Sequence, residues 1–132
     1  MKPAGRLAIC HFDWLPLPDS LVAATEALIL SHNPDWPLAG GTGTYPQWER
    51  DATAAGFRNP QTFSFDIDEP YTAEAWRGRI RASAGVGGSL PPEKVAAFDR
   101  DLAAMMAQDF PGERLLMPHR CWGLVCRRPS AR

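Results

Sequence analysis

The sequence predicts an α/β fold with three strands and about four helices. The segment 7–10 is a short, continuous apolar run, which is typical of a strand buried in a parallel sheet. The segment 61–68 alternates strictly between apolar and polar residues, as a strand with one solvated face does. The stretches between them carry apolar residues at helical spacing. At 132 residues, the chain is expected to form one domain over 1–132.

The first strand is expected to organise the fold. A turn, Lys2-Pro-Ala-Gly5, leads into the apolar run 7–10, and this run stops at His11, Phe12, Asp13 and Trp14. In open α/β sheets, ligands bind outside the carboxyl ends of the strands. The segment 11–14 is therefore the first candidate for one wall of a site.

Four helices are expected, and each has terminal signals. Asp19 or Ser20 can cap the first, which Asn33-Pro34 ends. The second opens at Thr44, which forms a capping-box spacing with Gln47, and it stops at Gly56. Thr72 can cap the third, which ends in the glycine-rich segment 84–88; the fourth runs from about 91 to 108.

The last strand is expected in two pieces, 115–117 and 121–126, interrupted near Pro118. In the strand 61–68, Phe63, Phe65 and Ile67 share one face. The first strand, apolar on both faces, requires neighbours that this chain barely supplies. The sequence therefore predicts that further strands precede it.

Composition excludes several classes of function. A formal net charge of -1 and a pI near 6.3 give no bulk attraction for nucleic acid or an anionic membrane. No stretch approaches the roughly 20 apolar residues that span a bilayer. Three cysteines without a spacing pattern and without a signal peptide indicate reduced thiols in a cytoplasmic protein.

The order of elements resembles the C-terminal part of the class I, Rossmann-like S-adenosylmethionine-dependent methyltransferases. In that family a Lys-Pro-Gly-Gly type of turn precedes the fifth strand, and Lys2-Pro-Ala-Gly5 stands before 7–10 here. Ala54-Ala-Gly-Phe57, followed by the alternating strand, is similar to the family's junction between its last helix and sixth strand. The resemblance implies that 121–126 is the seventh strand, inserted antiparallel between the other two. The segments 15–44 and 71–112 would be insertions on the substrate side.

The family's cofactor-binding elements have no counterpart in this chain. They are a glycine-rich turn after the first strand, an acidic residue at the end of the second, and residues after the fourth. The resemblance therefore implies a substrate-side portion of a methyltransferase acting on a small molecule, in which S-adenosylmethionine is bound by the intact family and not by this chain alone. The expectation is a fragment, inactive by itself, that pairs with a cofactor-binding half. The alternative is a non-enzymatic interaction domain that associates through its exposed first strand as a homo-oligomer or accessory subunit.

His11, Asp13 and Trp14 are candidate substrate-binding residues, because the resemblance places them beside the methyl-transfer pocket. A base that titrates near neutral pH and an aromatic wall suit such a site. The alternative is a hydrogen-bonded histidine at a strand end and a tryptophan that simply packs.

Trp76, Arg77 and Arg81 form a second candidate substrate-binding group. Arg77 and Arg81 share a helix face, and guanidinium groups bind carboxylates or phosphates through paired hydrogen bonds. The alternative is a solvated helix face on which Glu74 pairs with Arg77.

Two weaker patterns complete the candidates. Gly40-Gly-Thr-Gly43 could cradle a phosphate, but no strand precedes it, so a connecting loop is the alternative. Cys10, His11, His119 and Cys121 suit zinc chemically, yet they lack ligand spacing, and neighbouring residues of a strand face opposite ways. No metal site and no catalytic residue is predicted.

Overall fold

The structure is a computed structural model that describes residues 5–128. The chain packs as two compact units, each described here by itself. The first combines the described parts of 1–13, 42–67 and 119–132, and the second combines 14–41 with 68–118. The prediction of one domain over 1–132 stays a prediction.

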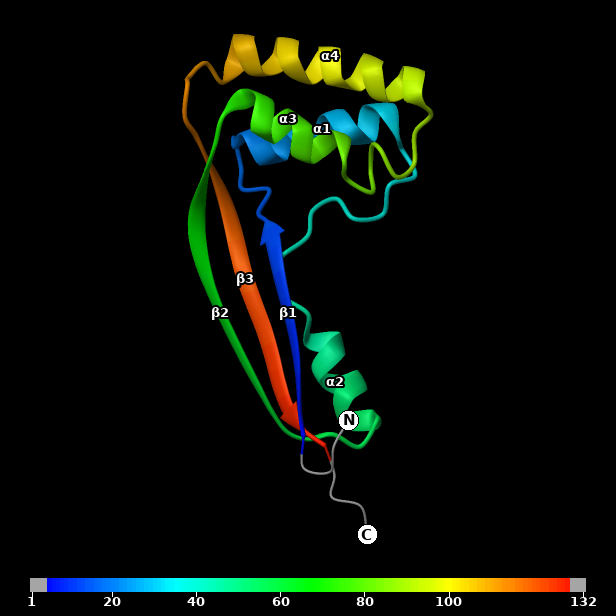
Figure 1. The fold of residues 1–132 in the computed structure, drawn as a ribbon, viewed down its shortest axis with the longest axis vertical. Helices are drawn as coiled ribbons and strands as arrows, with labels where there is room; N and C mark the ends of the chain where they lie inside the picture. Colours follow the sequence, from blue (N-terminus) through cyan, green and yellow to red (C-terminus); the bar gives the residue numbers. More distant parts are fainter. Residues whose placement is uncertain (1–4, 129–132) are drawn as a thin grey trace. The chain divides into compact units, whose positions relative to one another are not determined.

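Three strands, β1 (Arg6–Trp14), β2 (Arg58–Tyr71) and β3 (Leu115–Arg127), form one sheet in the order β1-β3-β2 (Figure 1). The Arg128 N–H donates to the Gly5 carbonyl at 2.9 Å, and the Leu15 N–H donates to the Pro118 carbonyl at 2.8 Å. These two bonds fix an antiparallel β1–β3 register. Two contacts, the Arg120–Asp66 ion pair and the Phe63 ring over Gly123, indicate an antiparallel β2–β3 register. The predicted insertion of the last strand between the other two is confirmed.

β1 differs from the prediction of a buried strand in a parallel sheet. It pairs with antiparallel β3 and lies at an edge, and it continues through Trp14 instead of stopping at Cys10. Its odd-numbered residues up to Asp13 are partly buried, whereas the even-numbered residues up to Phe12 are exposed. An apolar run does not show whether one or both faces will be covered, and here a helix covers one.

β3 also differs from the prediction, because it passes through Pro118 without a break. Proline lacks the N–H that would donate to Leu15, where β1 has just ended. The Leu15 carbonyl accepts the Leu17 N–H at 2.9 Å instead. The missing donor therefore leaves no unpaired acceptor, and the strand tolerates the proline.

In the first unit, α2 (Pro46–Ala54) covers one face of the sheet. Its N-terminus contradicts the predicted capping box. The N-cap residue is Tyr45, whose side chain makes no capping hydrogen bond, and the Thr44 hydroxyl pairs with that of Thr42. Its C-terminus agrees, since Gly56 adopts φ +85° and the Phe57 N–H reaches back to the Ala52 carbonyl at 3.0 Å. The buried cluster beneath α2 comprises Ala52, Trp122, Leu124 and Cys126.

The second unit contains the other three helices, α1 (Leu21–His32), α3 (Ala73–Arg81) and α4 (Pro92–Asp109). Ser20 and Thr72 cap α1 and α3 by accepting the N–H groups of Ala23 and Ala75. α4 packs on both α1 and α3 (Figure 1). The core between them includes Val22, Ile29, Trp76, Ile80, Phe98 and Leu102, all completely buried. No helix within residues 5–128 is long and apolar enough to span a membrane.

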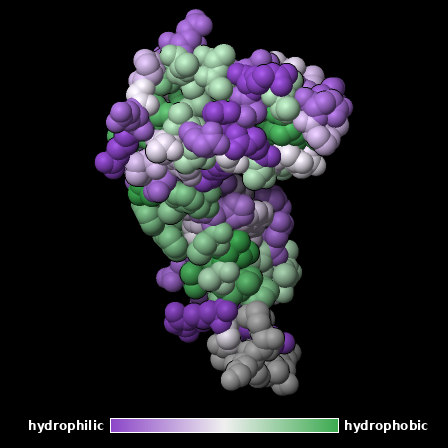
Figure 2. Space-filling view, turned by 45° about the horizontal axis from the view of Figure 1, so that its top comes forward, coloured by the Kyte–Doolittle hydropathy of each residue, from purple (hydrophilic) through white to green (hydrophobic). Residues whose placement is uncertain are grey.

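The sheet face opposite α2 stays open in the described part of the first unit. Its aromatic and aliphatic side chains are large and exposed, at 41% for Phe12, 48% for Phe63, 53% for Phe65 and 37% for Ile67. The space-filling view likewise shows a connected area of apolar surface, in green (Figure 2). The alternation predicted for β2 is correct, but its apolar side is not buried in this chain.

Candidate functional site

His11 and Asp13 lie together on the α2-covered face of β1, because residues two apart on a strand point the same way. The His11 Nδ1 atom lies 3.4 Å from the Asp13 Oδ2 atom. The Tyr45 hydroxyl donates a hydrogen bond to that same oxygen at 2.7 Å. Tyr45 and His11 thus approach the same carboxylate oxygen of Asp13.

Aromatic rings surround His11. Tyr45 and Trp48, which flank the start of α2, each have a ring centroid 4.6 Å from that of His11, and they stack on each other at 4.2 Å. Trp122, on β3, meets both of them edge-on. His11 stands opposite Trp122 in the β1–β3 register. We call His11, Asp13, Tyr45, Trp48 and Trp122 the His11 cluster.

The cluster holds a histidine with its orientation defined. Burial, followed by the hydrogen bond to Asp13 and the negative charge of Asp13, raises the pKa of Tyr45 to about 12. Tyr45 therefore remains a neutral donor at physiological pH. A carboxylate near Nδ1 favours a proton on that nitrogen and leaves Nε2 as the acceptor. This arrangement can bind a hydroxyl or an amide N–H group.

Trp14 belongs to the second unit and has a different environment. Its Nε1 donates to the buried Glu26 carboxylate at 2.7 Å, and its ring meets Trp76 edge-on at 5.6 Å. The Arg79 guanidinium lies 5.3 Å from the Trp14 ring centroid. The structure thus brings His11 and Asp13 together, and separately Trp14 and Trp76.

Glu26 also explains the glycine segment 40–43. Its second carboxylate oxygen accepts the Gly40 N–H at 2.7 Å. Gly40 and Gly43 both adopt positive φ, at +72° and +66°, which glycine tolerates without strain. A carboxylate of the chain itself occupies the place where a phosphate was considered, so a connecting loop is the supported interpretation.

Arg77 and Arg81 lie together on α3, in an ion-pair network with Glu74 and Asp99. Arg77 forms a paired contact with Asp99, through Nε at 3.0 Å and Nη2 at 2.5 Å. Arg81 bonds Asp99 at 2.8 Å and Glu74 at 2.7 Å. Trp76 is completely buried, and its Nε1 donates to the Thr25 hydroxyl at 3.1 Å. A substrate role for His11, Asp13, Trp14, Trp76, Arg77 and Arg81 stays a prediction.

Within residues 5–128, no group of three His, Cys, Asp or Glu side chains could hold a metal ion. The set Cys10, His11, His119 and Cys121 does not converge on one point. Cys10 is on the exposed face of β1, whereas His11 is on the face covered by α2.

Sequence reasoning missed Tyr45, Glu26 and Asp99. Tyr45 and Trp48 are three apart at a helix start, a spacing that could have indicated a shared aromatic face. Asp99 is 22 residues from Arg77 and on another helix, so no local pattern reveals their contact.

No protein-family model matches this sequence, and no curated protein matches it. Among solved structures, the chain is similar to one from Bacillus halodurans described as a "putative methyltransferase". The TM-score is 0.48 and the identity 13%, over 98% of this chain and 58% of that one. This chain thus spans little more than half the length of that protein. A similarity this weak establishes neither family nor activity.

Proposed function

We propose that this chain is the substrate-side portion of an S-adenosylmethionine-dependent methyltransferase acting on a small molecule in the cytoplasm, and that it functions together with a cofactor-binding half. The observation that carries the proposal is the strand order. β1 and β2 run parallel, α2 lies between them in the chain, and β3 is inserted antiparallel between them. This is the arrangement that the resembled family has at its C-terminal end.

The open edge of β1 supports a pairing partner. In the β1–β3 register, odd-numbered residues of β1 direct their backbone groups at β3. Ala8, Cys10 and Phe12 therefore direct theirs at the open edge. β1 has β3 as its one strand neighbour in the described part of the chain, and an apolar edge without proline is a template for another strand.

The other edge of the sheet has the opposite character. Even-numbered residues of β2 face away from β3 in the register set by Arg120 and Asp66. One of them is Pro60, which has no N–H to offer a neighbouring strand. The contrast favours β1 as the edge that receives a strand.

Within residues 5–128, the chain has no counterpart of the glycine-rich turn with which the resembled family binds S-adenosylmethionine. The glycine segment 40–43 follows no strand, and its Gly40 N–H already donates to Glu26. The cofactor would be bound by the other half. This chain would contribute His11, oriented by Asp13 and Tyr45, as a contact for the polar group of the acceptor molecule.

The coding DNA tests this proposal at low cost. We expect a strand, glycine-rich turn and helix to be encoded in frame upstream of Met1 or in an adjacent gene. Absence of such a segment from both places would contradict a methyltransferase formed by this chain and a cofactor-binding half.

A second candidate function, self-association along β1, is favoured by the same open edge. Two copies could pair β1 with β1 and extend the sheet. Light scattering over a range of concentrations would then detect a dimer that Ala8→Pro abolishes and Ala8→Thr, which keeps the N–H, preserves. A monomer at high concentration would exclude this alternative.

A further inference from the structure

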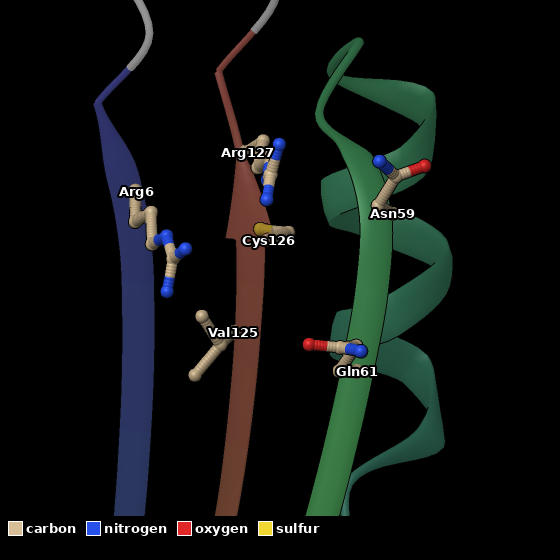
Figure 3. Close-up of a pocket in the computed structure, with 6 residues that line it drawn as sticks. All are labelled: Arg6, Asn59, Gln61, Val125, Cys126 and Arg127. Atoms are coloured by element: carbon tan, nitrogen blue, oxygen red, sulfur yellow. The ribbon is translucent and has the colours of Figure 1, made fainter.

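A hollow of about 220 Å³ lies on the open sheet face of the first unit, opposite the side that holds the His11 cluster. Figure 3 shows its side chains arriving from three neighbouring strands: Arg6 from β1, Val125 and Arg127 from β3, and Asn59 and Gln61 from β2. Nothing in the function proposed above uses this hollow.

Its two arginines stand directly opposite each other. The bond between Arg128 and Gly5 makes those two residues a hydrogen-bonded pair, so Arg6 and Arg127 form the adjacent non-hydrogen-bonded pair. In such a pair the Cα atoms are only about 4.5 Å apart, closer than in a hydrogen-bonded pair. Like charges at directly opposite positions destabilise a sheet. An anion between the guanidinium groups would relieve this repulsion.

No carboxylate among residues 5–128 forms an ion pair with Arg6 or Arg127. The side-chain amides of Asn59 and Gln61 likewise have no hydrogen-bond partner within that range, so they add donors to the same hollow. Arg120 and Arg77 differ, because Arg120 binds Asp66 and Arg77 binds Asp99. Two unpaired cations thus gather locally in a chain whose formal net charge is -1.

We propose that this hollow binds the phosphate group of a small organic phosphate. A phosphate monoester is close to a dianion at neutral pH and has three acceptor oxygens, which matches two adjacent guanidinium groups. A phosphate group has the volume of a few water molecules, each of which takes about 30 Å³ in the liquid. The hollow of about 220 Å³ is therefore larger than one phosphate group. The organic part then lies beside Val125 and Gln61. This site is independent of the proposed methyltransferase role.

Nuclear magnetic resonance titration of the whole chain tests the proposal, with glycerol phosphate and inorganic phosphate as probes. We expect both to shift the side-chain amide signals of Asn59 and Gln61, and glycerol phosphate to bind more tightly. Acetate, with one charge, should bind at least about tenfold more weakly than glycerol phosphate. Equal shifts with acetate, or no shift with millimolar phosphate, would overturn the proposal.

Matched variants separate a site from general charge attraction. Arg127→Gln should weaken glycerol phosphate binding about tenfold or more, because one charged fork is lost. Arg58→Gln removes the same charge from the other face of β2 and should change the affinity less than about twofold. Equal weakening by both variants would mean that the phosphate senses only net charge.

Thermal unfolding gives a readout that does not depend on detecting the ligand signals. At low salt without phosphate, Arg127→Gln should unfold at the same temperature as the wild type or higher, because a like-charge pair is relieved. Millimolar glycerol phosphate should then raise the unfolding midpoint temperature of the wild type and leave that of the variant unchanged. A midpoint that phosphate raises equally in both would count against the site.

Discussion

Asp13 is the residue on which the His11 cluster depends, because it contacts both His11 and the hydroxyl of Tyr45. Tyr45 accordingly has a raised pKa, first through burial and then through its bond to Asp13. The folded protein thus holds the Tyr45 proton more tightly than the unfolded chain does. Its contribution to stability is complete below pH 10 and is lost as the pH rises towards 12.

We therefore predict that Tyr45 titrates late. The chain has two tyrosines, so Tyr45 is the sole tyrosine in a Tyr71→Phe variant. The ultraviolet absorbance of its phenolate should appear at pH about 12 in the folded variant, and at about 10 in denaturant. Adding Asp13→Asn should lower the folded value, since the carboxylate charge is removed. A folded value near 10 would contradict the hydrogen bond to Asp13.

The Asp99 carboxylate binds two arginines of α3. Burial acts to raise its pKa, but the hydrogen bonds from Arg77 and Arg81 outweigh that effect and lower it. Asp99→Asn should therefore reduce the free energy of unfolding near neutral pH by ~1–2 kcal/mol, because one side chain holds two guanidinium groups. Denaturant unfolding measures this difference.

The sign of the pH dependence follows from the lowered pKa. The contribution of Asp99 is present above its ordinary value of 3.8 and is lost as the pH falls through the folded value. The stabilities of wild type and Asp99→Asn should converge in acid. A difference that stayed constant down to strongly acidic pH would show that the ion pairs do not cause it.

At the scale of the element, Phe63 and Gly123 link β2 to β3. The Phe63 ring lies over Gly123, where a Cβ atom would clash with it. Gly123→Ala should cost about 1–2 kcal/mol of unfolding free energy, because the ring must move off the strand. In a Phe63→Leu background the same substitution should cost less, which a double-mutant cycle measures. Equal costs in both backgrounds would show that the ring does not restrict this position.

The elements were largely predictable from sequence, whereas their burial was not. Ser20 and Thr72 are helix N-cap residues, and Gly56 directly follows the C-cap of α2. Each of these ends is stabilised by local hydrogen bonds, as the sequence predicts. The length of β1 and the exposure of Phe63 depend on which face α2 covers, a tertiary fact with no local signature. The predicted break at Pro118 was wrong, because the N–H that proline lacks falls at the point where β1 has ended and the Leu15 carbonyl already accepts the Leu17 N–H.

At the scale of the whole molecule, the strand order was predicted from a resemblance, not from residue pattern. The relation between β1 and β3 spans almost the entire chain, and residue patterns within short windows cannot specify it. The division of the six candidate substrate residues between two compact units was likewise invisible in the sequence. His11 and Asp13 became candidates because they follow an apolar strand, whereas Tyr45 was missed because it comes from another element.

Calorimetric titration can detect whether S-adenosylmethionine is bound by a cofactor-binding half that pairs with β1. The measurement compares the 132-residue chain with a longer polypeptide that includes the segment encoded upstream of Met1. We predict micromolar binding of S-adenosylmethionine by the longer polypeptide and no binding by the 132-residue chain. Micromolar binding by the 132 residues alone, or none by a longer polypeptide that contains the glycine-rich turn, would contradict it.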